Sequence, residues 1–190
     1  DVAVRPLQDG MVKDFELTEA IQRYFIRKAI GVSHLLKPRV YVTVPSRVSP
    51  VEKRVIREAA SSAGARKNAI HLIDKPFASA FGSGLPVFAP EGSMVVDVGG
   101  GTTEVAVISL GGIVLSRSIP TAGIMMDSVI VDFIKHDHNM LIGDRMAEDI
   151  KIDWGSALPV KEERRVVVRG RDLITGLPQT AEISSLRIYE

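Results

Sequence analysis

Cysteine is absent from this chain of 190 residues. Without cysteine there can be no disulfide framework and no thiolate metal site, and the composition fits a reducing compartment such as the cytoplasm. A net charge of either sign is nearly absent too, because 24 basic residues face 23 acidic ones and leave a formal charge of +1. So small a charge gives no electrostatic reason to expect nucleic acid or an anionic membrane as a partner.

Long hydrophobic runs are also missing. No apolar stretch reaches the roughly 18 residues of a membrane-spanning helix, and DVAVRPLQDG at the start lacks the pattern of a signal peptide. Aromatic residues make up only 5% of the chain, yet hydrophobic residues together reach 45% and charged residues 25%, as in ordinary globular domains. We expect a soluble, cytoplasmic chain with one large domain or two small ones.

Helices and short buried strands alternate in the first half. A helix is predicted from its cap at Thr18, with apolar side chains at spacings of three and four. Residues 40–45, VYVTVP, and 69–74, AIHLID, have the β-branched, apolar character of buried parallel strands. Between them Ser49 is predicted to cap a second helix, with Pro50 at its first position. This alternation predicts an α/β fold.

The second half begins with a predicted hairpin. Its strands are MVVDV and TEVAVISL, followed by a turn at Gly111 and Gly112 and a third strand, IVLSRSI. Helices are predicted over about 125–136 and 144–154, and two further strands follow. Trp154 and two consecutive methionines, Met125 and Met126, are predicted to lie in the core.

Three glycines interrupt the hairpin: Gly99, Gly100 and Gly101. Glycine tolerates positive φ and has no Cβ, so the backbone amides of such a loop can approach a ligand closely. Several amides turned toward one point form a nest for an anion, typically a phosphate. A glycine-rich turn without any ligand is an equally good interpretation of the glycines alone.

The neighbours of the glycines favour a nucleotide. Asp97 would repel a phosphate unless a divalent cation or water lay between them, which suggests a Mg²⁺-nucleotide with Asp97 contacting Mg²⁺ through water. Thr102 and Thr103 can hydrogen-bond a terminal phosphate or orient an attacking water. A strand follows the loop, so it is not a helix-opening dinucleotide or Walker loop.

The stretch DVGGGTTEVAVISLGGIV resembles the second phosphate loop of the actin and DnaK-type chaperone superfamily, and its residues are most similar to those of the MreB family of bacterial actins. KPRVYVTVPSRVSPVEKR, LIGDRMAEDIKIDWGSA and VRGRDLITGLPQTAEISS resemble the same family, in order. The resemblance implies an actin-like (ribonuclease H-like) ATPase fold, in which two domains each have a mixed sheet flanked by helices.

On the family plan the chain is the middle piece of a longer protein. Residues 1–85 would belong to the first domain, closing its small subdomain and then forming its large one. Residues 86–123 would start the large subdomain of the second domain, and 124–190 would form its small subdomain. The family's first phosphate hairpin would lie before Asp1 and its adenine motif after Glu190.

The resemblance also implies a function. ATP and Mg²⁺ would bind between the domains, and the protein would polymerise head to tail into paired, membrane-associated filaments. These would determine rod shape by organising cell-wall synthesis, with cell-wall elongation proteins as partners, at the inner face of the cell membrane. A pseudo-ATPase filament or a chaperone-like binding module without hydrolysis is the alternative. Leu35 and Leu36 match the family's membrane-inserting loop, although a loop packed on its own domain would use the same residues.

One position departs from the family. There a strand ends in Glu-Glu-Pro, and the second glutamate orients the attacking water; here LIDKPFASAFG places Asp74 and Lys75 at those positions. A lysine cannot accept a proton from water at neutral pH. Either hydrolysis is impaired, which we favour, or Asp74 substitutes from the neighbouring position. Lys75 could pair with a phosphate or be an ordinary solvated lysine.

The resemblance assigns further nucleotide contacts to the last third of the chain. Gly123 keeps one glycine of the family's Gly-Gly-Asp, while Ala122 and Ile124 replace its other two residues. Glu148 and Lys151, three residues apart on one predicted helix face, correspond to ribose ligands. On spacing alone they could equally be an exposed ion pair.

Overall fold

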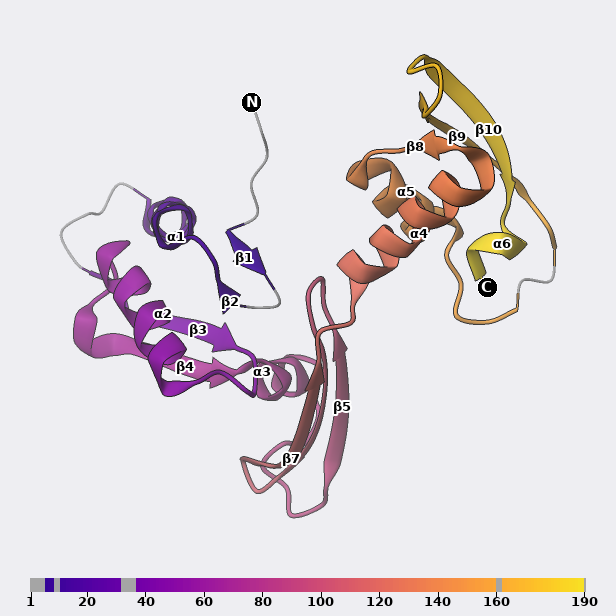
Figure 1. Ribbon diagram of the computed structural model, residues 1–190. Coiled ribbons are helices and arrows are strands. Elements are labelled where there is room, and N and C mark those ends of the chain that lie inside the picture. Colours follow the sequence, from indigo (N-terminus) through magenta and orange to yellow (C-terminus); the bar gives the residue numbers. More distant parts are fainter. Residues whose placement is uncertain (1–5, 9–10, 32–36, 160–161, 190) are drawn as a thin grey trace. The chain divides into compact units, whose positions relative to one another are not determined.

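The computed structural model of the chain is drawn in Figure 1. It describes residues 6–8, 11–31, 37–159 and 162–189. These fall into two compact units, Asp1–Pro120 and Thr121–Glu190. The domain and subdomain boundaries predicted after residues 85 and 123 stay predictions.

The first unit opens with a short antiparallel pair, β1 (Leu7–Gln8) and β2 (Met11–Val12), and a helix, α1 (Phe15–Ile30). The predicted cap at Thr18 is wrong, because Asp14 has the extended backbone of a capping residue and accepts a hydrogen bond from the Leu17 amide at 3.0 Å. Thr18 lies inside the helix, where its hydroxyl donates to the Asp14 carbonyl. A carboxylate placed one turn earlier satisfies the first free amides and starts the helix sooner.

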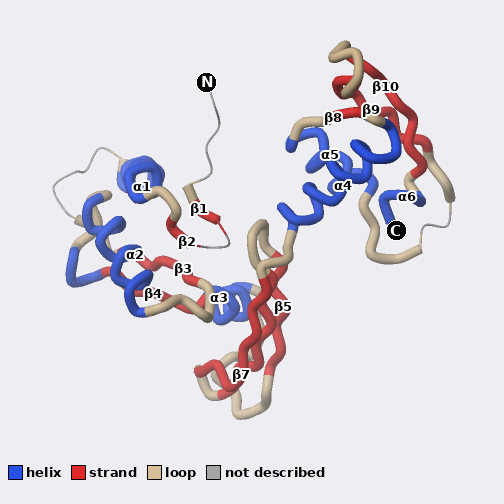
Figure 2. The backbone as a smooth tube through the Cα atoms, viewed as in Figure 1, coloured by secondary structure: helices blue, strands red, loops and turns tan. Residues whose placement is uncertain are grey.

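A parallel strand pair with a crossover helix follows, as predicted. β3 (Val40–Val44) pairs with β4 (Ile70–Asp74), and α2 (Pro50–Ser62) connects them. Ser49 caps α2 in a capping box. α2 packs against β4 and α1 packs against α2, so helices form a layer beside the two strands (Figure 2).

α3 (Lys75–Gly82) begins directly after β4, and a three-stranded antiparallel sheet follows it: β5 (Ser93–Val98), β6 (Thr103–Ser109) and β7 (Gly112–Ile119). The turn between β6 and β7 lies one residue earlier than predicted. Leu110 and Gly111 have φ of 50° and 76°, and Ser109 pairs with Gly112. The turn is therefore a two-residue hairpin loop in which Leu110 adopts the left-handed conformation usually reserved for glycine or asparagine.

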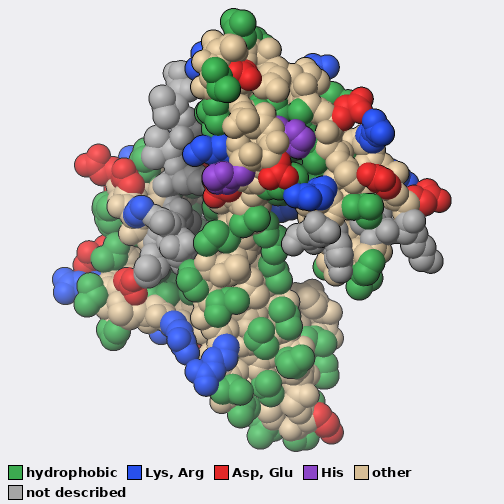
Figure 3. All heavy atoms as spheres, turned by 45° about the vertical axis from the view of Figure 1, so that its right-hand side comes forward, with side chains coloured by type: hydrophobic (Ala, Val, Ile, Leu, Met, Phe, Trp, Pro, Cys, Tyr) green, Lys and Arg blue, Asp and Glu red, His purple; other side chains and the backbone are tan. Residues whose placement is uncertain are grey.

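One face of this sheet packs on α3. Ala80 of α3 forms a buried cluster with Val87 and with Ala106 and Ile108 of β6. On the other face Met94, Val96 and Val98 are exposed, and Figure 3 shows hydrophobic side chains gathered over the sheet. The packed face is the one that brings α3 beside the glycine loop.

The second unit combines helices with an antiparallel sheet in the order β10-β9-β8. Its elements are α4 (Gly123–His138), β8 (Met140–Leu141), α5 (Asp144–Trp154), β9 (Arg165–Asp172), β10 (Pro178–Ser184) and α6 (Leu186–Tyr189). Trp154 packs against the core of this unit, as predicted. The core prediction for Met125 and Met126 is wrong, since both are about half exposed. No helix within the described ranges is long and apolar enough to cross a membrane.

Candidate functional site

The residues that depart from the family pattern lie at the junction between β4 and α3. Asp74 ends the strand and is the N-cap residue of α3, but its side chain makes no capping hydrogen bond. Lys75 is the first residue of the helix and Pro76 the second. The amino end of a helix carries partial positive charge, so a lysine there is electrostatically unfavourable unless an anion lies close by.

Asp97 supplies that anion. Its Oδ1 lies 2.8 Å from the Lys75 Nζ, and the two side chains retain only 13% and 30% of their exposure, respectively. The other carboxylate oxygen, Oδ2, accepts a hydrogen bond from the Ser79 hydroxyl, one helical turn beyond Lys75. Lys75 is therefore not an ordinary solvated lysine, because α3 and β5 hold it in an ion pair.

The ion pair changes the acidity of Asp97. Partial burial raises the pKa of the carboxyl, but the hydrogen bonds from Lys75 and Ser79, with the charge of Lys75, outweigh this and hold the pKa below its ordinary value. Asp97 is thus a carboxylate at neutral pH, and its charge is balanced within the protein by the Lys75 ammonium.

The glycine loop lies against the same ammonium. A Cβ built on Gly99 would lie 2.8 Å from the Lys75 Nζ and 3.3 Å from the Thr102 carbonyl oxygen. The Gly99 amide donates to that oxygen at 3.0 Å, which closes the loop. None of the three loop glycines has a φ in the left-handed region. Gly99 is therefore needed for close approach, and not for an unusual backbone conformation.

The Glu104 carboxylate connects segments near the glycine loop by hydrogen bonds. It is fully buried and accepts hydrogen bonds from the Ser46 amide at 3.3 Å, the Ser46 hydroxyl at 3.2 Å and the Ser118 hydroxyl at 3.3 Å. The segment after β3 is thereby joined to β6 and β7. Sequence reasoning missed Glu104 and Ser79. A charged residue at an inward position of an alternating strand, and a serine one turn after Lys75, are the signals that could have found them.

The residues around Asp97 do not fit a Mg²⁺ ion. Both carboxylate oxygens are engaged, one by an ammonium and one by a hydroxyl. A divalent cation at Asp97 would be repelled by the Lys75 ammonium beside it. Across the described parts of the chain, no group of three histidine, aspartate or glutamate side chains is arranged to hold a metal.

A second set of predicted residues meets in the second unit. The Lys151 Nζ donates to the Gly123 carbonyl at 3.2 Å and lies 2.8 Å from Oδ1 of Asp127. Gly123 and Asp127 are on the first turns of α4 and Lys151 is on α5, so the ammonium connects the two helices. Glu148 is on the same helix as Lys151 and is exposed. The ribose roles of Glu148 and Lys151 stay predictions.

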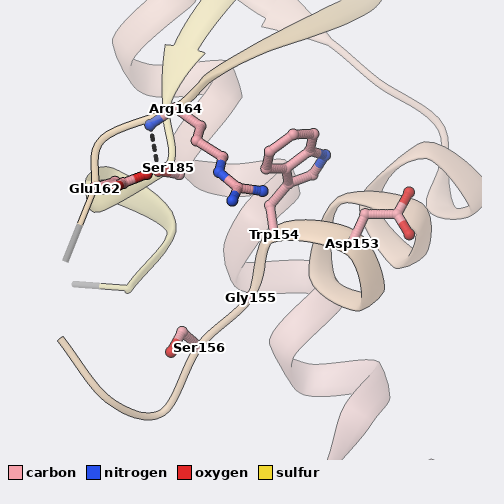
Figure 4. A pocket seen from close by; sticks show the side chains of 7 residues that line it. All are labelled: Asp153, Trp154, Gly155, Ser156, Glu162, Arg164 and Ser185. Atoms are coloured by element: carbon pink, nitrogen blue, oxygen red, sulfur yellow. Dashed lines mark hydrogen bonds between the residues drawn. The ribbon is translucent and has the colours of Figure 1, made fainter. Parts of the chain in front are cut away.

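The second unit also has a hollow of about 470 Å³. Residues at the end of α5 and directly after it, in the segment before β9 and directly after β10 line it: Asp153, Trp154, Gly155, Ser156, Glu162, Arg164 and Ser185. The Arg164 side chain extends toward the indole ring of Trp154, and the Arg164 amide donates to the buried Ser185 hydroxyl at 3.0 Å (Figure 4). No residue predicted to bind nucleotide lies in this hollow.

The predicted site residues thus fall into two groups. In the first unit Lys75, Asp97, Gly99 and Thr102 are brought together around the loop, with Thr102 buried. In the second unit Gly123 and Lys151 are in contact. The predicted membrane loop, Leu35 and Leu36, lies outside the described residues.

Comparisons with known proteins identify the family of the chain. The family model described as MreB/Mbl protein matches residues 2–190. The cell shape-determining protein Mbl of Bacillus cereus is 45% identical over 189 residues, covering 100% of this chain and 56% of that protein. The cell shape-determining protein MreB of Escherichia coli is 46% identical, covering 99% of this chain and 54% of that protein. The chain therefore spans about half the length of the curated relatives it matches.

Solved structures support the same fold. The crystal structure of MreB5 of Spiroplasma citri bound to AMPPNP matches with a TM-score of 0.88 and 34% identity, covering 97% of this chain and 55% of that one. The structure of MreB5 bound to ADP matches with a TM-score of 0.86. The fold is the predicted actin-like α/β fold, and with a family match along nearly its whole length this chain belongs to the MreB/Mbl family.

Proposed function

We propose that the chain is part of an ATP-binding, actin-like cytoskeletal protein that polymerises and determines cell shape by organising cell-wall synthesis. The observation that carries the proposal is the glycine loop between β5 and β6, closed on itself and set beside Asp97 and Lys75. Its support is the chain's membership of a family whose curated members are named cell shape-determining proteins, and a neighbour solved with both ADP and AMPPNP.

The loop has the chemistry that a nucleotide phosphate needs. Glycines without Cβ atoms leave the amides of residues 99–101 open to close approach by an anion. The amino end of α3 and the Lys75 ammonium add positive charge at the same place. Thr102 and Thr103 follow the loop and can donate to a terminal phosphate.

The ion pair favours a filament that binds ATP without hydrolysing it. Asp97 engages the Lys75 ammonium in an ion pair, and an ammonium cannot accept a proton from an attacking water. Asp74, the alternative base, is one residue away at the end of β4. A nucleotide-binding pseudo-ATPase filament is therefore the second candidate function, and the ion pair favours it over a filament that hydrolyses ATP.

The proposed function includes assembly into filaments and a location at the cell membrane. Head-to-tail contacts that do not close produce a filament from one kind of subunit. Weak insertion of Leu35 and Leu36 into a lipid surface would become effective when many copies line up in a filament. The filament would then lie in the cytoplasm at the inner face of the cell membrane, where it would recruit cell-wall elongation proteins.

Nucleotide binding and sedimentation test this function together. The native protein that carries this chain is titrated with a fluorescent ATP analogue and centrifuged with and without ATP. We expect saturable binding, competition by ATP but not by adenosine, and a pelleted fraction that increases with ATP. Binding without pelleting would favour the chaperone-like module, and absence of binding would contradict the proposed function.

A further inference from the structure

The geometry points to Lys75 as a built-in replacement for the divalent cation at the glycine loop, so that this protein binds nucleotide phosphates without Mg²⁺. The inference rests on the proposed function and specifies how the same site recognises its ligand. It concerns a position where the residues present do not fit the metal that the fold family implies.

The first argument is charge. A phosphate approaching the loop would meet the negative charge of Asp97, which is ionised at neutral pH. A cation must lie between the two for both to occupy one site. The Lys75 ammonium already lies 2.8 Å from Oδ1 of Asp97, while Oδ2 is held by the Ser79 hydroxyl. The neutralising charge is therefore supplied by the chain itself.

The second argument is position. The Lys75 Nζ occupies the space where a side chain on Gly99 would be, 2.8 Å from that Cβ position. The ammonium therefore lies against the backbone of the loop that is proposed to bind phosphate. An ammonium has three N–H donors in a tetrahedral arrangement, so it can contact Asp97 and a phosphate oxygen at the same time.

The third argument is that the ammonium is held in place. Lys75 is the first residue of α3, and 70% of its side-chain surface is covered, in contrast with a freely moving surface lysine. Ser79, one turn further along the same helix, fixes the carboxylate that holds the ammonium. A Mg²⁺ ion placed at Asp97 would have to displace this arrangement or tolerate a positive charge beside it.

ATP affinity measured in excess Mg²⁺ and in excess EDTA tests the inference. For the native protein we expect the two dissociation constants to agree within about threefold, because no metal is needed at the loop. In Lys75→Glu, two carboxylates face the phosphates, and we expect affinity in EDTA to fall by about tenfold or more relative to Mg²⁺. Lys67→Glu makes the same charge change at an exposed lysine at the start of a short 3-10 helix and is the matched control, expected to behave as the native protein.

Lys75→Met keeps a long side chain without the charge, and it serves if Lys75→Glu folds poorly. We expect it to bind ATP about tenfold more weakly than the native protein in EDTA, with partial recovery in Mg²⁺. Native binding that requires Mg²⁺ would overturn the inference and leave the proposed function standing. No binding with or without Mg²⁺ would overturn both the inference and the proposed function. The two outcomes therefore distinguish failure of the inference alone from failure of the proposed function.

Discussion

Two lysine–aspartate pairs, one in each unit of the molecule, have nearly the same geometry. Lys75 and Asp97 are 2.8 Å apart in the first unit, as are Lys151 and Asp127 in the second. The lysines keep 30% and 24% of their side-chain exposure and the aspartates 13% and 11%. By distance and burial alone the two pairs are interchangeable.

Their surroundings assign them different roles. Lys151 also donates to the Gly123 carbonyl and connects α4 to α5, next to Ile150 in the core of the second unit. Lys75 instead lies against a glycine loop that leaves room for its ammonium. The first pair is placed to bind a ligand, and the second to hold two helices together. An ion pair's role therefore depends on what surrounds it.

The largest expected effect is on the stability of the second unit. Lys151→Met would leave Asp127 largely buried without its cation, and we expect the free energy of unfolding to fall by about 2 kcal/mol, less than for a fully buried pair. Urea unfolding measures the loss. The double variant Lys151→Met with Asp127→Leu should recover part of it, and a single-variant loss below about 0.5 kcal/mol would show that the pair does not hold the helices.

In Lys75→Met we expect the loss of ATP binding to exceed the loss of stability, the opposite of Lys151→Met. Asp97 keeps the hydrogen bond from the Ser79 hydroxyl, so we expect the unfolding free energy to fall by only about 1 kcal/mol. ATP affinity should fall by about tenfold, whereas in Lys151→Met the effect on stability should dominate. Equal losses of stability in the two lysine variants would remove the contrast between the pairs.

Gly99→Ala tests whether the close approach of the loop matters. The new Cβ would lie 2.8 Å from the Lys75 Nζ, and the flexible end of the lysine would have to shift. We expect a small stability change, about 0.5–1 kcal/mol, but weaker ATP binding by several-fold. Gly82→Ala at the end of α3 is the control, because no atom within 4 Å obstructs its Cβ. Equal ATP affinity in both variants would argue against the role of Gly99.

The smallest expected effect is on the pH dependence of stability. Because folding lowers the pKa of Asp97, the ionised carboxylate contributes its full stabilisation at any pH above the pKa of the unfolded state. This stabilisation is lost in acid, as the pH falls through the lowered pKa of the folded state. NMR titration should show the Asp97 pKa rising in Ser79→Ala and rising further in Lys75→Met. Ser184→Ala, on β10 in the second unit, should leave it unchanged. A native Asp97 that titrates normally would contradict the ion pair.

Local sequence signals predicted much of the fold. The cap at Ser49, the proline after it and the paired strands β5 and β6 depend on residues that are close together in the chain, and the structure confirms them. The cap at Thr18 was mispredicted because the Asp14 carboxylate, one turn earlier, already accepts a hydrogen bond from one of the first free amides of α1. The hairpin turn lies one residue earlier than predicted because Leu110 adopts a positive φ, which is more usual for glycine.

The site was less predictable because its chemistry depends on contacts between distant segments. The sequence identified Lys75 as unusual and Asp97 as a charge beside the glycines. It could not indicate that α3 brings the two within 2.8 Å. Nor could it show that Lys151 is engaged by Asp127 and Gly123. Pairing across a fold requires the packing of whole elements, which no short motif encodes.

Phosphate release from ATP tests the central claim most directly, since the account assigns to Lys75 a binding role in place of a catalytic one. The native protein and Lys75→Glu are compared under the same conditions with Mg²⁺ and ATP, with Lys67→Glu as the charge control. The account predicts that the native protein and the control bind ATP but release no phosphate above background, and that Lys75→Glu gains release. Brisk phosphate release by the native protein would contradict it.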